Sequence, residues 1–357
     1  MSISVVFSPE HALHVPDGEV WVGVRIPGTE LPARGEEIAA ALREAGHHFV
    51  SPRPIDDEEL EAVHSPDLVE FLRTAWQRWQ DSDYVSDPGQ DQVVPYAFPL
   101  SAMTSGRPPR RPASVGALTG MYAMDTMTLI GEGTWEAARA AAAAAVTAAM
   151  MVEEGERVVY AAVRPPGHHA GTSFYGGSCY LNNAALAAQR LVDLGLGPVA
   201  VIDIDAHHGN GTEQIFYESA EVRYGSVHID PAAGYFPHWL GFADEIGAGS
   251  GAGANLNVPL DPGAGDEPWL AAIEQLVTFG AGARSLVVSL GVDAWRDDPE
   301  SPLVVSLDGY GRAGSLLGRM DLPTVVVQEG GYDLASLGHL VARFLRDFEA
   351  GNNAGGD

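Results

Sequence analysis

The second half of the chain alternates short apolar runs with segments of helical periodicity, and this alternation constrains the fold more than any other feature. The runs cover 158–163, 199–204, 222–227, 285–290 and 324–327. Unbroken apolar runs are typical of parallel strands covered on both faces. The helical pattern at 183–194 lies between two of them and indicates βαβ units. We therefore expect an α/β fold with a central, mostly parallel sheet flanked by helices.

The N-terminal part adds two expected helices, over 33–48 and 57–80. No repeat or linker divides the chain, so we expect one domain over 1–350 and a disordered tail over 351–357. Residues 84–116 have no periodicity and contain six prolines. A loop this long in a compact domain is usually functional or an interaction element. We expect it to be ordered near a site or a subunit contact, rather than a disordered insertion.

Charge and cysteine content limit the partners and the compartment. The chain has 48 acidic and 20 basic residues and a formal net charge of −28. This excess argues against nucleic acid and anionic membranes as partners. It would attract a cationic substrate, or simply serve solubility. The single cysteine, Cys179, rules out an internal disulfide, and we expect no cysteine-based zinc site. Neither a signal peptide nor a bilayer-length apolar stretch is evident, so we expect a cytoplasmic protein.

Reactive side chains follow four of the apolar runs at their ends. The segments are RPPGHH (164–169), DIDAHHGNG (203–211), GVD (291–293) and QEGGY (328–332). In parallel α/β sheets, ligands bind beyond the carboxyl ends of the strands. The four loops are therefore expected to converge on one crevice.

Three of these side chains suit a metal ion. Asp205 and His207 are two residues apart, so in an extended chain they point the same way. Asp293, from another strand end, can complete a three-ligand set. Three protein ligands with an open fourth position are typical of catalytic zinc. Two carboxylates and one imidazole are harder ligands than usual for zinc, so Fe²⁺ and Co²⁺ are alternatives.

The adjacent His168 and His169 need separate roles. One imidazole can take a proton from metal-bound water and pass it to a leaving amine. Asp203 and Asn210 are candidate orienting partners: a carboxylate would favour a charged imidazole, whereas an amide would leave the pKa nearer its ordinary value. Tyr332, after two glycines, can donate a hydrogen bond to a developing oxyanion.

Four motifs together resemble the histone deacetylase superfamily: RPPGHHA (164–170), DIDAHHGNGT (203–212), SLGVD (289–293) and EGGY (329–332). GTWEAA (133–138), GGSCYLNNAA (176–185) and FPHWLGFADEIGAGSGAGAN (236–255) are similar to the bacterial acetylpolyamine amidohydrolases. The resemblance implies the arginase/deacetylase fold. It also implies a homodimer in which an insertion at 84–130 shapes the subunit contact and a narrow substrate channel.

The resemblance further implies the roles of the site residues. Zinc would be bound by Asp205, His207 and Asp293. His169, oriented by Asn210, would be the general base and later the acid. His168, paired with Asp203, would stabilise the transition state electrostatically. Tyr332 and zinc together would polarise the acyl carbonyl.

Two further sets of residues follow from the resemblance. Asp203, with the backbone around Ser226 and Val227, would form a structural potassium site. Gly177 and Phe236 would line the tunnel for the acylated amine.

Two departures from the family leave the substrate open. Ser178 stands where family members usually have an aromatic residue, which predicts a wider or more polar tunnel. Polyamine-specific members have acidic residues on the rim within the segment matching 116–128, where this chain has only Asp125. A bulkier or more apolar acylated amine, such as an intermediate of secondary metabolism, is therefore an alternative to an acetylpolyamine.

We expect a zinc-dependent amidohydrolase in which metal-activated water attacks a small N-acetylated amine. An acetyl-lysine protein deacetylase is one alternative, although the 84–130 insertion should hinder bulky substrates. A manganese ureohydrolase is another, but it needs extra carboxylates where Asn210 and Ala294 stand. A non-catalytic protein that binds an acylated amine would be expected to lack a ligand, the base or Tyr332, and none of them is lost.

Overall fold

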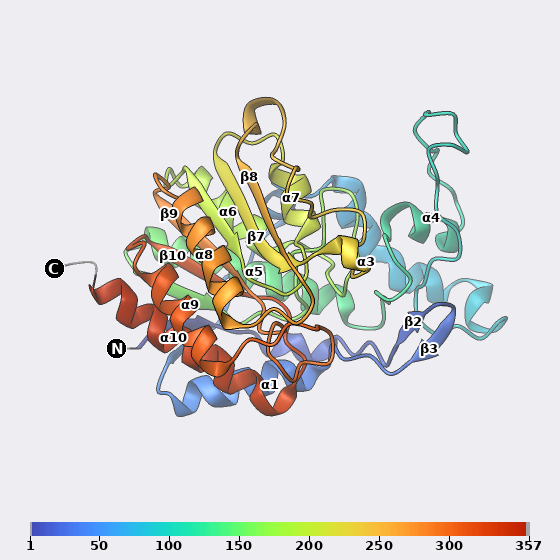
Figure 1. Ribbon diagram of the computed structural model, residues 1–357. Coiled ribbons are helices and arrows are strands. Elements are labelled where there is room, and N and C mark those ends of the chain that lie inside the picture. The colour runs from blue at the N-terminus through green and yellow to red at the C-terminus, as the bar shows by residue number, and fades with distance from the viewer. Residues whose placement is uncertain (1, 355–357) are drawn as a thin grey trace.

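The computed structural model describes residues 2–354, and its centre is one parallel β-sheet (Figure 1). Eight strands lie in the order β4-β1-β5-β10-β9-β6-β7-β8, and each neighbouring pair runs parallel. The strands are β1 (Ser4–Val6), β4 (His48–Val50), β5 (Val158–Ala161), β6 (Val199–Asp203), β7 (Val222–Ile229), β8 (Asn255–Leu260), β9 (Ser285–Leu290) and β10 (Thr324–Gln328). This sheet confirms the predicted α/β architecture.

The five apolar runs are all strands of this sheet. β9 has the predicted bounds, and the other four differ from prediction by at most two residues, at their C-terminal ends. Each residue of β5, β6, β9 and β10 is buried. The physical reason for the unbroken apolar pattern is that helices cover both faces of a parallel sheet.

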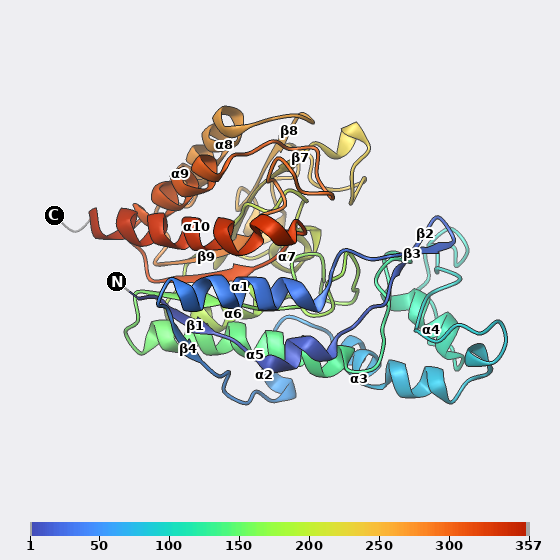
Figure 2. The same cartoon turned by 90° about the horizontal axis from the view of Figure 1, so that it is seen from below.

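Helices form a layer on each side of the sheet (Figure 2). One side carries α1 (Pro32–Glu44), α8 (Asp266–Phe279), α9 (Leu307–Gly318) and α10 (Leu334–Ala354). The other carries α2 (Asp57–Glu61), α3 (Pro66–Gln80), α4 (Val115–Tyr122), α5 (Thr134–Glu153) and α6 (Asn183–Asp193). The remaining short elements are α7 (Asn210–Phe216), η1 (Pro9–Leu13), η2 (Asp83–Val85), η3 (Pro231–Ala233) and η4 (Gly249–Gly251).

Three expected boundaries were wrong. The single helix expected over 57–80 is two helices, because Pro66 starts α3 and Ser65 accepts the N-terminal hydrogen bond from the Leu68 amide. The helix expected over 33–48 ends at Glu44, because the residues from His48 join the sheet as β4. The tail expected to be disordered from Gly351 begins as helix, since α10 continues to Ala354. Residues 355–357 lie outside the described residues.

The 84–130 insertion extends from the body of the molecule beside a small antiparallel hairpin of β2 (Glu19–Trp21) and β3 (Val24–Ile26) (Figure 1). Its last residues return to the loops that follow the central strands. There, Asp125 Oδ2 accepts from the Gly177 amide at 2.6 Å and Thr128 Oγ1 accepts from the Ser178 amide at 2.9 Å. None of the helices within residues 2–354 combines the length and apolarity needed to cross a membrane.

Candidate active site

A three-residue cluster of potential metal ligands lies beyond the carboxyl ends of β6 and β9. Asp205, His207 and Asp293 each offer a ligand atom, and these atoms lie within 4.8 Å of one another. His207 Nδ1 is 2.9 Å from Asp293 Oδ2 and 3.3 Å from Asp205 Oδ1. Backbone N–H groups of Gly330 and Ala206 donate to Asp205 Oδ2 and Asp293 Oδ1, both at 2.8 Å. The backbone thus holds both carboxylates facing one imidazole.

The electrostatics of this cluster fit a bound cation. Asp205 and Asp293 are 1% and 0% exposed. Burial and the nearby charge of Asp205 raise the pKa of Asp293 to about 7. Two buried carboxylates are costly unless a positive charge balances them. Gly330 leaves room for the two carboxylates, because a Cβ at this position would lie 2.6 Å from Asp205 Oδ2 and 2.7 Å from Asp293 Oδ2.

His168 and His169 lie beside the cluster, each with a different partner. His168 Nδ1 is 3.0 Å from Asp203 Oδ2, and His169 Nδ1 is 2.7 Å from Asn210 Oδ1. Burial opposes a charge on His168, but Asp205 and Asp203 outweigh it and raise the pKa of His168 to about 10. Burial and the charge of His168 lower the pKa of His169 well below its ordinary value. The shifts therefore favour a charged His168 and a neutral His169.

Buried charges tie the loop of these histidines to the loop of Tyr332. Glu329 Oε2 accepts from the backbone N–H groups of Gly167 at 2.7 Å and His168 at 3.1 Å. Arg34 donates to the carbonyl oxygens of Glu329 and Gly331, both at 2.6 Å. Its guanidinium carbon also lies 4.7 Å from the centre of the Tyr332 ring. These contacts fix the strand ends from which the reactive side chains project.

A cavity of about 350 Å³ opens over these groups, with Tyr332, His169 and His207 in its wall. Burial raises the pKa of Tyr332 well above its usual range, so its hydroxyl remains a hydrogen-bond donor. The Phe236 ring stands edge-on to His169, with ring centres 4.9 Å apart. Gly177 also lines the cavity; its φ is +55°, and a Cβ there would lie 2.3 Å from the His169 ring. A larger residue at position 177 would therefore displace His169.

Ser178 lines the same cavity, as expected for the position where an aromatic residue is usual in the family. Whether its small side chain widens the range of substrates stays a prediction. Asp125, the one acidic residue of the 116–128 segment, is not among the residues that line this cavity. Its carboxylate accepts from the backbone amides of Gly177, Met127 and Thr128. Asp125 instead holds the turn that carries Gly177 and Ser178.

Two carboxylates do line the cavity, but they come from outside the 116–128 segment. They are Glu19 in β2 and Glu300 in the loop after β9. Thr29 Oγ1 donates to Glu300 Oε1 at 2.8 Å. Burial and the charge of Glu300 raise the pKa of Glu19 to about 7, against a backbone hydrogen bond from Thr29. Sequence reasoning missed both residues. Glu300 could have been considered because it follows the expected ligand Asp293 by seven positions in the same loop, whereas no pattern pointed to Glu19.

A second group of potential metal ligands among residues 2–354 is His168, Cys179 and Glu329. The cysteine was expected to take no part in such a group. Each member is already engaged: the Cys179 thiol donates to the Gly177 carbonyl at 3.3 Å, and His168 and Glu329 have the partners given above. This group therefore supports the catalytic loops.

The residues expected to bind potassium are neighbours in the sheet. Asp203 of β6 pairs with Ser226 of β7, and Val227 follows. Asp203 Oδ2 also accepts from the Tyr224 hydroxyl at 3.0 Å, and Ser226 Oγ lies 2.8 Å from His228 Nδ1. Potassium binding here stays a prediction.

Known proteins are similar to this chain over almost its whole length. The family model described as "Histone deacetylase domain" matches residues 29–348. The chain belongs to the histone deacetylase family. An acetylpolyamine amidohydrolase of Mycoplana ramosa is 39% identical over 347 residues, covering 96% of this chain and 98% of that protein. Acetylpolyamine amidohydrolase 1 of Pseudomonas aeruginosa is 38% identical over 351 residues, covering 96% and 98%.

A solved structure agrees with these sequence relatives. The crystal structure of acetylpolyamine aminohydrolase from Burkholderia pseudomallei matches with a TM-score of 0.92 and 36% identity, covering 98% of this chain and 99% of that one. Together the comparisons confirm the predicted family and fold. This histone deacetylase family member is a deacetylase, an enzyme that hydrolyses amide bonds, and its family is metal-dependent.

Proposed function

We propose that this deacetylase removes the acetyl group from a small amine that carries a second, positively charged amine. The observation that carries the proposal is the pair Glu19 and Glu300, which line the same cavity as His169, His207 and Tyr332. Carboxylates at the cavity wall favour a cation and disfavour an apolar chain. The names of the relatives, acetylpolyamine amidohydrolases, support the same class of substrate.

We also propose zinc as the metal, bound by Asp205, His207 and Asp293. The support is the donor set: two buried carboxylates and an imidazole, whose ligand atoms lie within 4.8 Å of one another. The chemistry that zinc supplies is polarisation of the acyl carbonyl and a lowered pKa of water. The same donor set suits Fe²⁺ and Co²⁺, which remain alternatives.

The protein's own groups divide the proton and charge chemistry among them. His169 Nδ1 is engaged by Asn210 Oδ1, so Nε2 is the atom that takes a proton from the attacking water and returns it to the leaving amine. His168, charged beside Asp203, stabilises negative charge as it develops. The Tyr332 hydroxyl donates to the carbonyl oxygen as it becomes an oxyanion.

A matched pair of substrates tests this proposal. N-acetylputrescine and N-butylacetamide have similar chains, but only the first has a cationic end. For the zinc-loaded protein we expect kcat/KM to favour the cation by about tenfold or more, the ratio that corresponds to about 1.4 kcal/mol. In Glu300→Gln, which keeps the shape and removes the charge, this preference should shrink. Equal kcat/KM for the two amides in the wild-type enzyme would refute the proposed substrate class.

We further propose that two copies of the chain associate through the 84–130 insertion. The insertion projects from the body of the molecule (Figure 1). The support is the apolar side chains exposed on this segment: Tyr96 is 67%, Leu100 61% and Met103 74% exposed. Exposed apolar residues gathered on one projection are typical of an interaction surface. Sedimentation equilibrium should report a dimer, and Leu100→Asp should shift it towards monomer. A monomeric wild type at all concentrations would contradict the proposal.

A further inference from the structure

We propose that Asp298 is a positioning residue whose single carboxylate fixes both Glu300 at the cavity wall and Tyr332 at its reactive end. Through it, recognition of the second amine is coupled to placement of the oxyanion donor. The coupling rests on the proposed function, because Glu300 is the group proposed to meet the amine.

The two oxygens of Asp298 hold different segments. Oδ1 accepts from the Glu300 amide at 3.0 Å. Oδ2 accepts from the Tyr332 amide at 2.6 Å and from the Asp333 amide at 3.2 Å. Asp298 is 7% exposed, so water competes little for these bonds. The two segments leave neighbouring strands, β9 and β10, and Asp298 joins them just beyond the sheet.

Further contacts hold the two side chains whose backbone amides Asp298 binds. Glu300 is held a second time, by the hydroxyl of Thr29, and the Tyr332 ring lies under the guanidinium of Arg34. A shift of Asp298 would therefore pull both functional side chains away from fixed neighbours. The Trp295 indole, 3.2 Å from Asp333 Oδ2, is an additional tie between the same loops. It should keep the loops together when Asp298 is changed.

The chemistry of an amide supplies one informative variant. In Asp298→Asn, one end of the side chain becomes an NH₂ donor. Whichever way the amide turns, that donor faces a backbone N–H, of Glu300 or of Tyr332, so one connection must break. Asp298→Ala removes both acceptors. Asp297→Asn is the matched control. Asp297 is the adjacent residue and is exposed, and its substitution removes the same charge.

The test measures kcat and KM of the full-length, zinc-loaded variants on N-acetylputrescine and N-butylacetamide, with zinc content and Tm as checks. We expect Asp298→Ala to lower kcat on both amides by about tenfold, as for one lost bond to a positioned group. It should also reduce the preference for the cation by at least about threefold. Asp298→Asn should change at least one of these readouts, and Asp297→Asn neither.

The outcomes separate this inference from the proposed function. A folded, zinc-loaded Asp298→Ala that changes only one readout overturns the coupling. If Asp298→Ala does not fold, Asp298→Asn decides, and a wild-type profile on both readouts overturns the inference. A wild-type enzyme without preference for the cation refutes the substrate class and the coupling together. A strong wild-type preference that survives in both variants refutes the coupling alone.

Discussion

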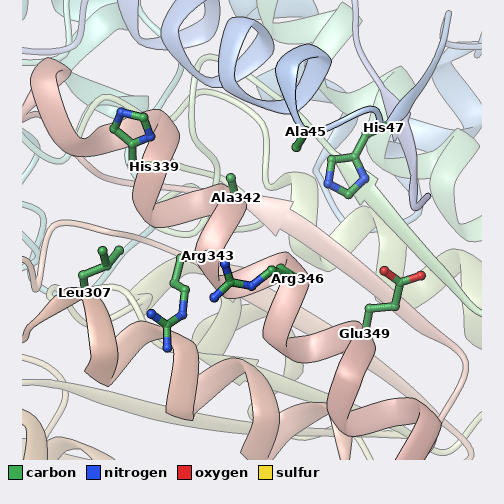
Figure 3. Close-up of a pocket in the computed structure, with 8 residues that line it drawn as sticks. All are labelled: Ala45, His47, Leu307, His339, Ala342, Arg343, Arg346 and Glu349. Carbon is green, nitrogen blue, oxygen red and sulfur yellow. The ribbon is translucent and has the colours of Figure 1, made fainter. Parts of the chain in front are cut away.

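Two cavities of this molecule contain histidines and charged groups, but they differ in how those charges are held. The larger, about 550 Å³, lies between α10, the end of α1 and the start of α9, and we call it the helix cavity. His47, His339, Arg343 and Arg346 line it (Figure 3). The smaller, about 350 Å³, is the candidate active site. Volume alone would favour the first.

In the helix cavity the charges compensate one another near solvent. Arg343 donates to Asp347 at 2.6 Å and to Asp308 at 3.0 Å, and Arg346 donates to Asp347 at 2.9 Å. The Arg346 side chain is 66% exposed. Exposed ion pairs of this kind usually contribute little to stability.

In the active site, by contrast, carboxylates are buried beside imidazoles and backbone N–H groups at the ends of parallel strands. Asp203 and Asp293 are both 0% exposed. The pKa of His168 is raised to about 10 while that of His169 is lowered, although the residues are adjacent. Burial and close neighbouring charges together shift these two pKa values in opposite directions, and the buried carboxylates favour a bound cation. The comparison teaches that the placement of charge, more than the size of a cavity, marks the reactive region.

The largest expected effect comes from removing a metal ligand. Asp293→Ala should lose both bound zinc and detectable deacetylase activity, because one imidazole and one carboxylate make an incomplete donor set. The measurements are zinc per chain by atomic absorption and turnover of N-acetylputrescine. Asp308→Ala removes the aspartate that pairs with Arg343 of the helix cavity, and this variant should keep both zinc and activity. Full zinc content in Asp293→Ala would show that the ligand assignment is wrong.

Removing an active-site imidazole should come next. His169→Ala should keep zinc but lose about 10²–10⁴ in kcat, the usual contribution of a general base. His339→Ala, the matched change in the helix cavity, should stay at the wild-type rate. Steady-state kinetics and zinc analysis on both variants check this. If the two variants had similar kcat, the contrast between the cavities would disappear.

A smaller effect concerns pH. The pKa of Glu19 is raised to about 7, so its carboxyl is mostly neutral below that pH and ionised above it. An alkylamine stays protonated through this range. The KM for N-acetylputrescine, divided by that for N-butylacetamide, should therefore fall as pH rises through about 7. Glu19→Gln should flatten this ratio; a slope that persists in that variant would point to another group.

The smallest effect is expected for the exposed arginine of the helix cavity. Arg346→Ala should change the free energy of unfolding by less than about 1 kcal/mol, as is usual for exposed ion pairs. Its kcat and KM should match the wild type. Urea unfolding and steady-state kinetics are the measurements. A large loss of activity would mean that the helix cavity communicates with the active site.

Much of the fold and of the metal cluster could be predicted because the underlying pattern is local. An apolar run of four to six residues indicates a buried strand wherever the chain places it. Asp205 and His207 share a face because alternate residues of extended chain do so. The helix boundaries were less predictable. Whether residues after Glu44 continue a helix or join a sheet edge depends on neighbours distant in sequence.

The sequence by itself determined the central strands, the loops that follow them and the residues able to bind the metal. From the residues alone, either histidine could have paired with Asp203 or Asn210. The tertiary structure places His168 beside Asp203 at the end of β6 and His169 beside Asn210 at the start of α7. Only the tertiary structure turned Asp125 towards the backbone and brought Glu19 and Glu300 to one cavity. The physical reason is that long-range proximity arises when separate elements pack, and short sequence patterns do not encode it.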